Sequence, residues 1–190
     1  MKITKTQSLA NRAHIVDTAS QLFRERGYDG VGVAELMATA GFTQGGFYKH
    51  FGSKADLMAE AAEKSLAQSI AGTNDLDPVG FVNRYVSREH RDGRGVGCTM
   101  AALCGDAARQ SEELKATFAS GVENMLAALQ EKYAADQEVT TQEARERMID
   151  LLAHAMGAVM LSRACPDDST LADEILDVCR TEMIARLASD

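Results

Sequence analysis

The sequence predicts an all-α protein of about nine helices, with a small N-terminal domain and a larger helical domain behind it. Three observations favour this fold class. The 190 residues include only two prolines, and nine methionines and many alanines favour helix. Apolar residues recur at helical spacing along most of the chain. No alternating pattern typical of a strand continues for more than a few residues.

Short helical segments separated by glycines make up the N-terminal part. The first helix is expected to begin at Ser8 or Asn11 and to end at Gly27, because glycine readily takes the left-handed conformation that ends helices. Ser53 is placed to cap a later helix with its hydroxyl. The further helices expected here span about residues 33–40, 43–51 and 54–71.

Longer helices are expected in the remainder of the chain. Asp77 and Pro78 suit a helix start, because the missing proline N–H does no harm in the first turn. Cys165 and Pro166 are expected to end the penultimate helix. The charged, Gly-rich stretch 90–97 is expected to be a loop. The predicted helices span about 78–89, 99–108, 111–133, 140–164 and 170–187.

The net charge of −8 argues against a nucleic-acid partner when it is considered alone. The charge is unevenly distributed, however. Residues 1–54 carry seven Lys or Arg and four Asp or Glu, a net charge of +3, which leaves −11 for the rest. A small basic head on an acidic body is compatible with DNA binding by the head.

The segment Ala40-Gly41-Phe42-Thr43 is typical of the turn in a helix-turn-helix. Gly41 can end the first of two short helices, Phe42 can pack under the turn, and Thr43 can cap the second helix. The second helix of such a motif enters the major groove of DNA. We therefore divide the chain into a DNA-binding domain, 1–53, and a second domain, 54–190.

Two adjacent glycines open the expected recognition helix. Without Cβ atoms, Gly45 and Gly46 allow the backbone to approach bases or phosphates closely. The alternative is that they are only a loop before a short helix. Gln44 suits an adenine edge, whereas the neighbouring polar side chains suit phosphate oxygens. The predicted DNA-binding residues are Thr43, Gln44, Gly45, Gly46, Tyr48, Lys49, His50 and Lys54.

The stretch from Ile15 to Leu57 resembles the DNA-binding domain of the TetR/AcrR family of bacterial transcriptional repressors. The resemblance is carried by "IVDTASQLFRERGYDG" and "ELMATAGFTQGGFYKHFGSKADLM". It implies phosphate anchors at Thr43, Tyr48, His50 and Lys54, and base-facing positions at Gln44, Gly46 and Lys49. The chain departs from the family pattern at Gly32, often a threonine, and at Gly46, commonly a larger residue.

For residues 54–190 the resemblance implies helices around a pocket for a small apolar effector and a dimer made by the last two helices. Apolar stripes give the expected dimer interface: Met148, Leu152, Ala155, Val159, Leu171, Ile175, Val178 and Met183. Apolar or soft side chains on the central helices give the expected pocket: Phe81, Tyr85, Met100, Cys104, Met125, Leu129, His154 and Met156. Ordinary core packing is the alternative for both sets.

Cysteine suggests a second mode of sensing on the same scaffold. "VGCTMAALCGDAARQ" resembles a segment of TetR-family repressors that respond to electrophiles or oxidants, which implies a thiol sensor at Cys98. Arg91 and Arg94 lie nearby in sequence and could activate the thiol. A small buried cysteine that only packs is the alternative. A bridge from Cys98 to Cys104 is not expected, because six residues place them on different helix faces.

An enzymatic function is not expected. The four histidines are scattered, and the chain has no HExxH, phosphate loop or GxSxG motif. No catalytic residue, metal or cofactor is therefore predicted.

The four cysteines lack CxxC spacing, and no run of about 18 apolar residues is present. We expect a cytoplasmic homodimer whose partners are operator DNA and an unknown small-molecule effector.

Overall fold

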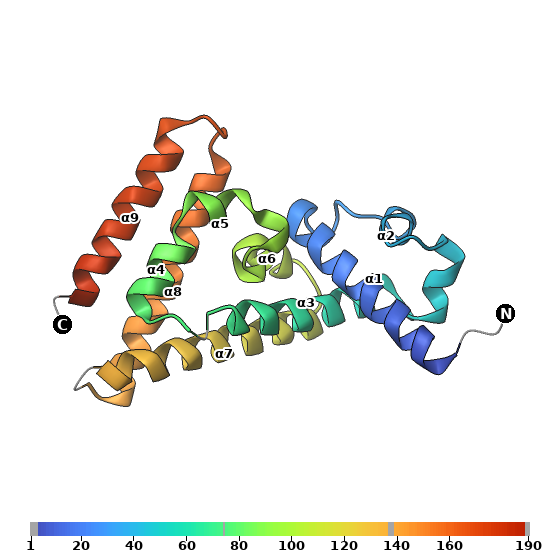
Figure 1. Cartoon of the computed structure of the whole chain (residues 1–190), viewed down its shortest axis with the longest axis horizontal. Coiled ribbons are helices and arrows are strands. Elements are labelled where there is room, and N and C mark those ends of the chain that lie inside the picture. The colour runs from blue at the N-terminus through green and yellow to red at the C-terminus, as the bar shows by residue number, and fades with distance from the viewer. Residues whose placement is uncertain (1–3, 74, 137–138, 189–190) are drawn as a thin grey trace.

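The computed structural model describes residues 4–73, 75–136 and 139–188, and over this range the chain is helical without strands (Figure 1). The all-α prediction is confirmed. The elements are α1 Lys5–Arg26, α2 Val33–Thr39, η1 Gln44–Lys49, α3 Lys54–Ala71, α4 Pro78–Tyr85, α5 Arg88–Asp92, η2 Arg94–Val96, α6 Thr99–Ala107, α7 Glu112–Asp136, α8 Thr141–Ala164 and α9 Thr170–Ala188, where η denotes a 3-10 helix.

Local capping explains most helix starts. The Ser53 hydroxyl accepts a hydrogen bond from the Asp56 N–H at 3.1 Å, and the Asp77 carboxylate accepts one from the Gly80 N–H at 2.6 Å. Thr140 forms a reciprocal capping box with Glu143. These three starts agree with the sequence prediction. The predicted start of α1 is wrong, because Thr4 caps that helix instead.

The predicted helix 78–89 is broken in two. α4 ends at Tyr85, and the Ser87 hydroxyl then accepts a hydrogen bond from the His90 N–H at 3.1 Å to start α5. The expected loop at 90–97 is consequently partly helical, as the end of α5 and η2. The break turns the chain so that segment 88–98 lies between α1 and α8.

α3 connects the two ends of the molecule. Its first turns pack against α1, and its length lies along α7 (Figure 1). Leu66 of α3 packs so tightly on Gly121 of α7 that a Cβ at Gly121 would come within 2.8 Å of it. α8 and α9 form a helical hairpin at the far end from α2 (Figure 1). The domain boundary at residues 53–54 stays a prediction, because α3 serves both parts.

Polar contacts join the C-terminal end of α1, and Tyr28 just after it, to later parts of the chain. The Arg24 guanidinium donates from Nε and Nη2 to the Gly95 carbonyl at 2.8 and 2.5 Å. The Tyr28 N–H donates to the Asp106 carboxylate at 3.1 Å. The DNA-binding end therefore contacts segment 88–98 and α6 directly. Within the described ranges, every helix is too short or too polar to cross a membrane.

Candidate nucleic-acid interface and effector cavity

The turn between α2 and η1 has the geometry that the sequence predicts. Gly41 takes φ +79°, its N–H donates to the Ala38 carbonyl at 3.0 Å, and the Phe42 N–H donates to the Met37 carbonyl at 2.8 Å. This hydrogen-bond pattern is a Schellman motif, which needs a left-handed residue at the glycine position. The turn therefore fixes the direction in which the following segment leaves α2.

The expected recognition helix is a 3-10 helix rather than an α-helix. The Gly46 N–H bonds to the Thr43 carbonyl at 2.9 Å, whereas the Thr43 side chain makes no capping hydrogen bond, contrary to the prediction. Phe47 and Phe51 are buried with ring centroids 5.4 Å apart, as predicted for core residues. These two rings anchor the segment and leave its opposite face toward solvent.

Most of the predicted DNA-binding residues lie on that solvent face. Thr43, Gln44, Gly45 and Lys49 are exposed, and the Tyr48 ring is 70% exposed. Gly46 and His50 are half-buried. Which of these residues contact DNA stays a prediction.

The adjacent glycines are not required by the fold of the chain itself. Neither Gly45 nor Gly46 has a positive φ. A Cβ on Gly45 would meet nothing within 4 Å, and one on Gly46 would lie 3.6 Å from the Met37 side chain, an ordinary contact. A Cβ therefore fits at both positions, and the one on Gly45 would lie in open space.

Few cations at this end are available to a ligand. Arg12 pairs with Glu60, Arg26 pairs with Glu35, and Lys64 with Asp17 at 2.6 Å. The Lys54 ammonium points inward and donates to the Tyr28 carbonyl at 2.5 Å. A phosphate contact by Lys54 would need another of its three protons.

Lys49 differs from these cations. It is exposed on η1 and has no acidic partner in the described part of the chain. It is therefore the cation of η1 that is free to meet a phosphate.

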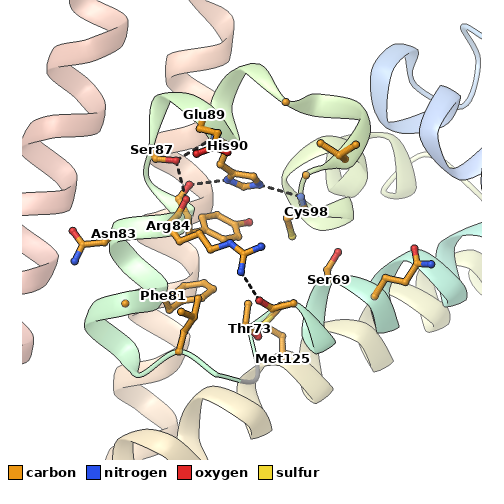
Figure 2. Close-up of a pocket in the computed structure, with 18 of the residues that line it drawn as sticks. Ser69, Thr73, Phe81, Asn83, Arg84, Ser87, Glu89, His90, Cys98 and Met125 are labelled. Atoms are coloured by element: carbon orange, nitrogen blue, oxygen red, sulfur yellow. Dashed lines mark hydrogen bonds between the residues drawn. The ribbon is translucent and has the colours of Figure 1, made fainter.

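A cavity of about 600 Å³ opens between α3, α4, α7 and segment 88–98 (Figure 2). Its apolar wall includes Leu76, Phe81, Met125 and the ring of Tyr85. Its polar wall comes from α1, α3, α4 and residues 87–98. The polar lining residues are Arg24, Ser65, Gln68, Ser69, Thr73, Asn83, Arg84, Ser87, Glu89, His90 and Cys98.

The cavity contains three of the eight predicted pocket residues, and its role as an effector site stays a prediction. Phe81, Tyr85 and Met125 line the cavity. Five other predicted residues do not: Met100 and Leu129 are buried in the core, Cys104 lies on α6, and His154 and Met156 lie half-buried on α8. The prediction failed there because side-chain chemistry does not reveal which helix face meets the cavity. It also missed His90, since the turn at Val86 gives no clear sequence signal.

His90 bridges two parts of the cavity wall through both ring nitrogens. Nε2 accepts the Cys98 N–H at 3.0 Å, which leaves Nδ1 to donate to the Tyr85 carbonyl at 2.7 Å (Figure 2). Only the neutral imidazole with its proton on Nδ1 satisfies both bonds. Burial lowers the pKa of His90, with the nearby Arg163 and Arg84 adding to this effect. His90 is therefore a neutral positioning residue.

Cys98 lies on the cavity wall at the start of α6 and is buried. Arg91 and Arg94, the arginines predicted to activate this thiol, donate elsewhere: Arg91 to the Ser162 carbonyl at 3.3 Å and Arg94 to the Arg163 carbonyl at 3.4 Å. All four cysteines are free thiols. Burial raises the pKa of the Cys104 thiol to about 11, so Cys104 is almost wholly protonated at neutral pH.

Two arginines clamp segment 88–98 to α8. The Arg91 guanidinium is only 1% exposed and donates to the carbonyls of Ser162, Cys165 and Pro166 at 3.3–3.5 Å. Arg163 of α8 donates back to the carbonyls of His90 and Arg91 at 2.7 and 2.9 Å. The cavity wall is thus joined to α8 on one side and, through Gly95, to α1 on the other.

The exposed faces of α8 and α9 differ from the predicted dimer stripe. The predicted residues Met148, Leu152, Ala155, Val159 and Met183 are buried in the chain's own core, so they cannot form an interface. Ile175 is half-buried. Large apolar residues instead remain exposed at Ile149, Met160, Leu161, Leu171 and Val178, and two of these, Leu171 and Val178, were predicted.

Residues 15–61 match the family model described as "Bacterial regulatory proteins, tetR family". These N-terminal residues belong to the TetR family of bacterial regulatory proteins. The HTH-type transcriptional regulator AcrR of Shigella flexneri is 36% identical over 74 residues, which are 39% of this chain and 34% of AcrR. The HTH-type transcriptional repressor NemR of Escherichia coli K12 is 26% identical over 128 residues, 62% of this chain and 64% of NemR.

Solved structures of TetR-family regulators share the fold of nearly the whole chain. A regulator from Chloroflexus aurantiacus superposes with a TM-score of 0.75 at 22% identity and covers 96% of each chain. The reduced form of E. coli NemR gives a TM-score of 0.69 at 20% identity and covers 92% of this chain and 95% of NemR. The matching stretches reach less than two thirds of either curated relative's length.

Proposed function

We propose that this TetR-family chain is a dimeric repressor that binds a palindromic operator and leaves it when a small molecule enters the cavity. The observation that carries the proposal is the exposed face of η1. Gln44, Tyr48 and Lys49 project there, directly after a fixed turn, while Phe47 anchors the other side. Among the described residues, no hydrogen bond or ion pair uses the polar groups of these three side chains, so they are available to the major groove.

Each polar group on η1 has a distinct role in the proposal. Gln44 and Lys49 read base edges or adjacent phosphates, and the exposed Tyr48 hydroxyl donates to a phosphate oxygen. The open space left by Gly45 and Gly46 lets the backbone come close to the duplex. Because readout falls to few side chains, we expect a modest penalty for most single base changes.

A second copy of this chain supplies a second η1 for the other half-site of the operator. Large apolar side chains remain exposed on α8 and α9, and Leu161, Leu171 and Val178 are each more than half exposed. A face of this kind on a helical hairpin is typical of a symmetric protein interface. Pairing it with its copy gives a dimer that meets two half-sites about 34–36 Å apart on one DNA face.

Segment 88–98 offers a route from the cavity to the DNA-binding domain. His90 and Cys98 line the cavity, and Gly95 of the same segment holds Arg24 of α1. Gly95 lies so close to α1 that a Cβ there would come within 2.3 Å of the Glu25 carboxylate. A ligand that displaces the His90 side of this segment would therefore move α1, and with it η1.

A mobility-shift titration with DNA from upstream of the chain's own gene tests the proposal. We expect specific, salt-sensitive binding that survives excess unrelated DNA, with one dimer per site. The footprint should show two protected half-sites about one helical turn apart. Binding that unrelated DNA abolishes at equal concentration would contradict the proposal.

A thiol switch at Cys98 is the second candidate, supported by its position on the cavity wall, which Arg24 also lines. NemR, to which the chain is similar, has a structure described as its reduced form. In this alternative, hypochlorite or an electrophile releases wild type from DNA but not Cys98→Ser, with Cys165→Ser as the matched control. Equal release of wild type and Cys98→Ser would remove this candidate.

A further inference from the structure

We infer that the cavity accepts a neutral, largely apolar molecule that presents a hydrogen-bond acceptor, such as a carbonyl oxygen, to the hydroxyl of Tyr85. The inference rests on the proposed effector role of the cavity and specifies its ligand chemistry. It follows from one unused proton on the cavity wall and from how the neighbouring polar groups are already bonded.

The Tyr85 hydroxyl is buried without a hydrogen-bond partner. In the described residues, three side-chain oxygens share this state, those of Tyr28, Tyr85 and Thr99, and of these only Tyr85 lines the cavity. The residue is 6% exposed. Leaving a buried hydroxyl unbonded costs about 1–3 kcal/mol, so an unpartnered group on a cavity wall points to a molecule that occupies the cavity.

The Tyr85 ring is held in place. Its centroid lies 5.0 Å from that of Phe81 and 4.5 Å from that of His90, and its own carbonyl receives the His90 Nδ1 proton. Burial is the main cause that raises the pKa of Tyr85 well above its ordinary value, and the nearby Cys98 raises it further. The hydroxyl therefore keeps its proton. The Cys98 sulfur is close, yet it is a weak acceptor and forms no hydrogen bond of acceptable geometry with the hydroxyl.

The other hydroxyls of the inner wall already donate hydrogen bonds to backbone carbonyls of α3. The Ser65 hydroxyl donates to Ala62, that of Ser69 to Ser65 at 2.9 Å, and that of Thr73 to Ile70 at 2.7 Å, each time to a backbone carbonyl. Both nitrogens of His90 are used as well. The inner wall therefore offers acceptor lone pairs in several places, but one free donor, at Tyr85.

The same wall argues for a neutral and mostly apolar ligand. Phe81, Leu76 and Met125 supply apolar surface, and His90 is neutral. Three charged residues also line the cavity. Arg84 and Glu89 are solvent-exposed, so their charges lie at the open side, and the Arg24 guanidinium already donates to the Gly95 carbonyl and the Ser20 hydroxyl. A buried ligand charge would find no free counter-charge near Tyr85 and would be costly. A volume of about 600 Å³ accommodates a molecule with two aromatic rings.

Benzophenone and 1,1-diphenylethylene test this inference, because they have nearly the same shape and differ by a carbonyl oxygen in place of a CH₂ group. Dissociation constants are measured by titration calorimetry without DNA, for wild type, Tyr85→Phe and Tyr28→Phe. Tyr28→Phe is the matched control, since it removes another buried, unpartnered hydroxyl away from the cavity. Operator binding is measured separately, so failure here leaves the DNA-binding proposal standing.

We expect wild type and Tyr28→Phe to bind benzophenone about three- to tenfold more tightly than 1,1-diphenylethylene, and Tyr85→Phe to lose this preference. Without ligand, Tyr85→Phe should melt at or above the wild-type temperature, because it removes an unpaired polar group. A preference that survives in Tyr85→Phe, or no binding of either probe, would overturn the inference. A lower melting temperature for Tyr85→Phe would also overturn it, because the hydroxyl would then have a partner in the empty protein.

Discussion

Replacing Gly27 by alanine should destabilise the chain more than any other single glycine-to-alanine change at a helix end. Gly27 has φ +75° and ψ 167°, a region that side-chain-bearing residues avoid at a cost of about 1–3 kcal/mol. A Cβ there would also come within 2.5 Å of the Asp106 carboxylate, which must then move. That movement breaks its bond to the Tyr28 N–H, which adds about 1–3 kcal/mol. The two terms together are about 2–6 kcal/mol.

Gly41→Ala is the matched comparison. Gly41 also has a positive φ, +79°, but a Cβ there would meet nothing within 4 Å. Only the backbone term of about 1–2 kcal/mol remains. The difference between the two variants therefore isolates the contact between α1 and α6.

Urea unfolding followed by circular dichroism measures both variants at one fixed protein concentration, because dimerisation makes stability concentration-dependent. In an Asp106→Ala background, Gly27→Ala should cost at least about 1 kcal/mol less than in wild type. Equal costs for Gly27→Ala and Gly41→Ala, or no dependence on Asp106, would refute the interdomain contact.

Three further predictions concern separate parts of the chain. Gly46→Thr should change operator preference while its free energy of unfolding stays within about 0.5 kcal/mol of the wild-type value, because the added Cβ has room beside Met37. A Gly46→Thr variant that does not fold would show that the backbone needs glycine. The pKa of His90 is lower in the folded state than in the unfolded state, so the neutral imidazole stabilises the fold above about pH 6.5. As the pH falls below this value the stabilisation is lost, by at most about 1.4 kcal/mol of unfolding free energy per pH unit. Urea titrations from pH 7.5 to 5.5 should therefore show a smaller loss for His90→Gln than for wild type, and parallel losses would contradict the neutral role. Leu161→Glu should yield monomers in sedimentation, whereas Leu9→Glu, at a similarly exposed position on α1, should not.

Features set by local chemistry could be predicted from the sequence. The starts at Ser53 and Asp77 and the glycine turn at Gly41 follow from hydrogen bonds within three to five residues. The buried Phe47 follows from its spacing to Phe51. Such features need no knowledge of what packs on the segment, which is why they were found correctly.

Features set by tertiary contacts were predicted less well. The stripe through Met148 and Leu152 is apolar whether it meets a partner or the chain's own α9, so the sequence could not distinguish interface from core. His90 lines the cavity because α4 ends at Tyr85 and the chain changes direction there. The segment that follows is held by Arg91, whose guanidinium donates to the Ser162 carbonyl of α8. Long-range partners of this kind leave little trace in local sequence patterns.

The exposed face of η1 is tested most directly by the salt dependence of operator binding. Fluorescence anisotropy titrations of wild type, Lys49→Ala and Lys115→Ala against the upstream duplex, from 50 to 200 mM salt, give the slope of log K against log salt. We expect Lys49→Ala to bind more weakly with a slope about one unit smaller, whereas Lys115→Ala, on α7, should match wild type. An unchanged affinity and slope for Lys49→Ala would contradict the assignment of η1 as the DNA-binding element.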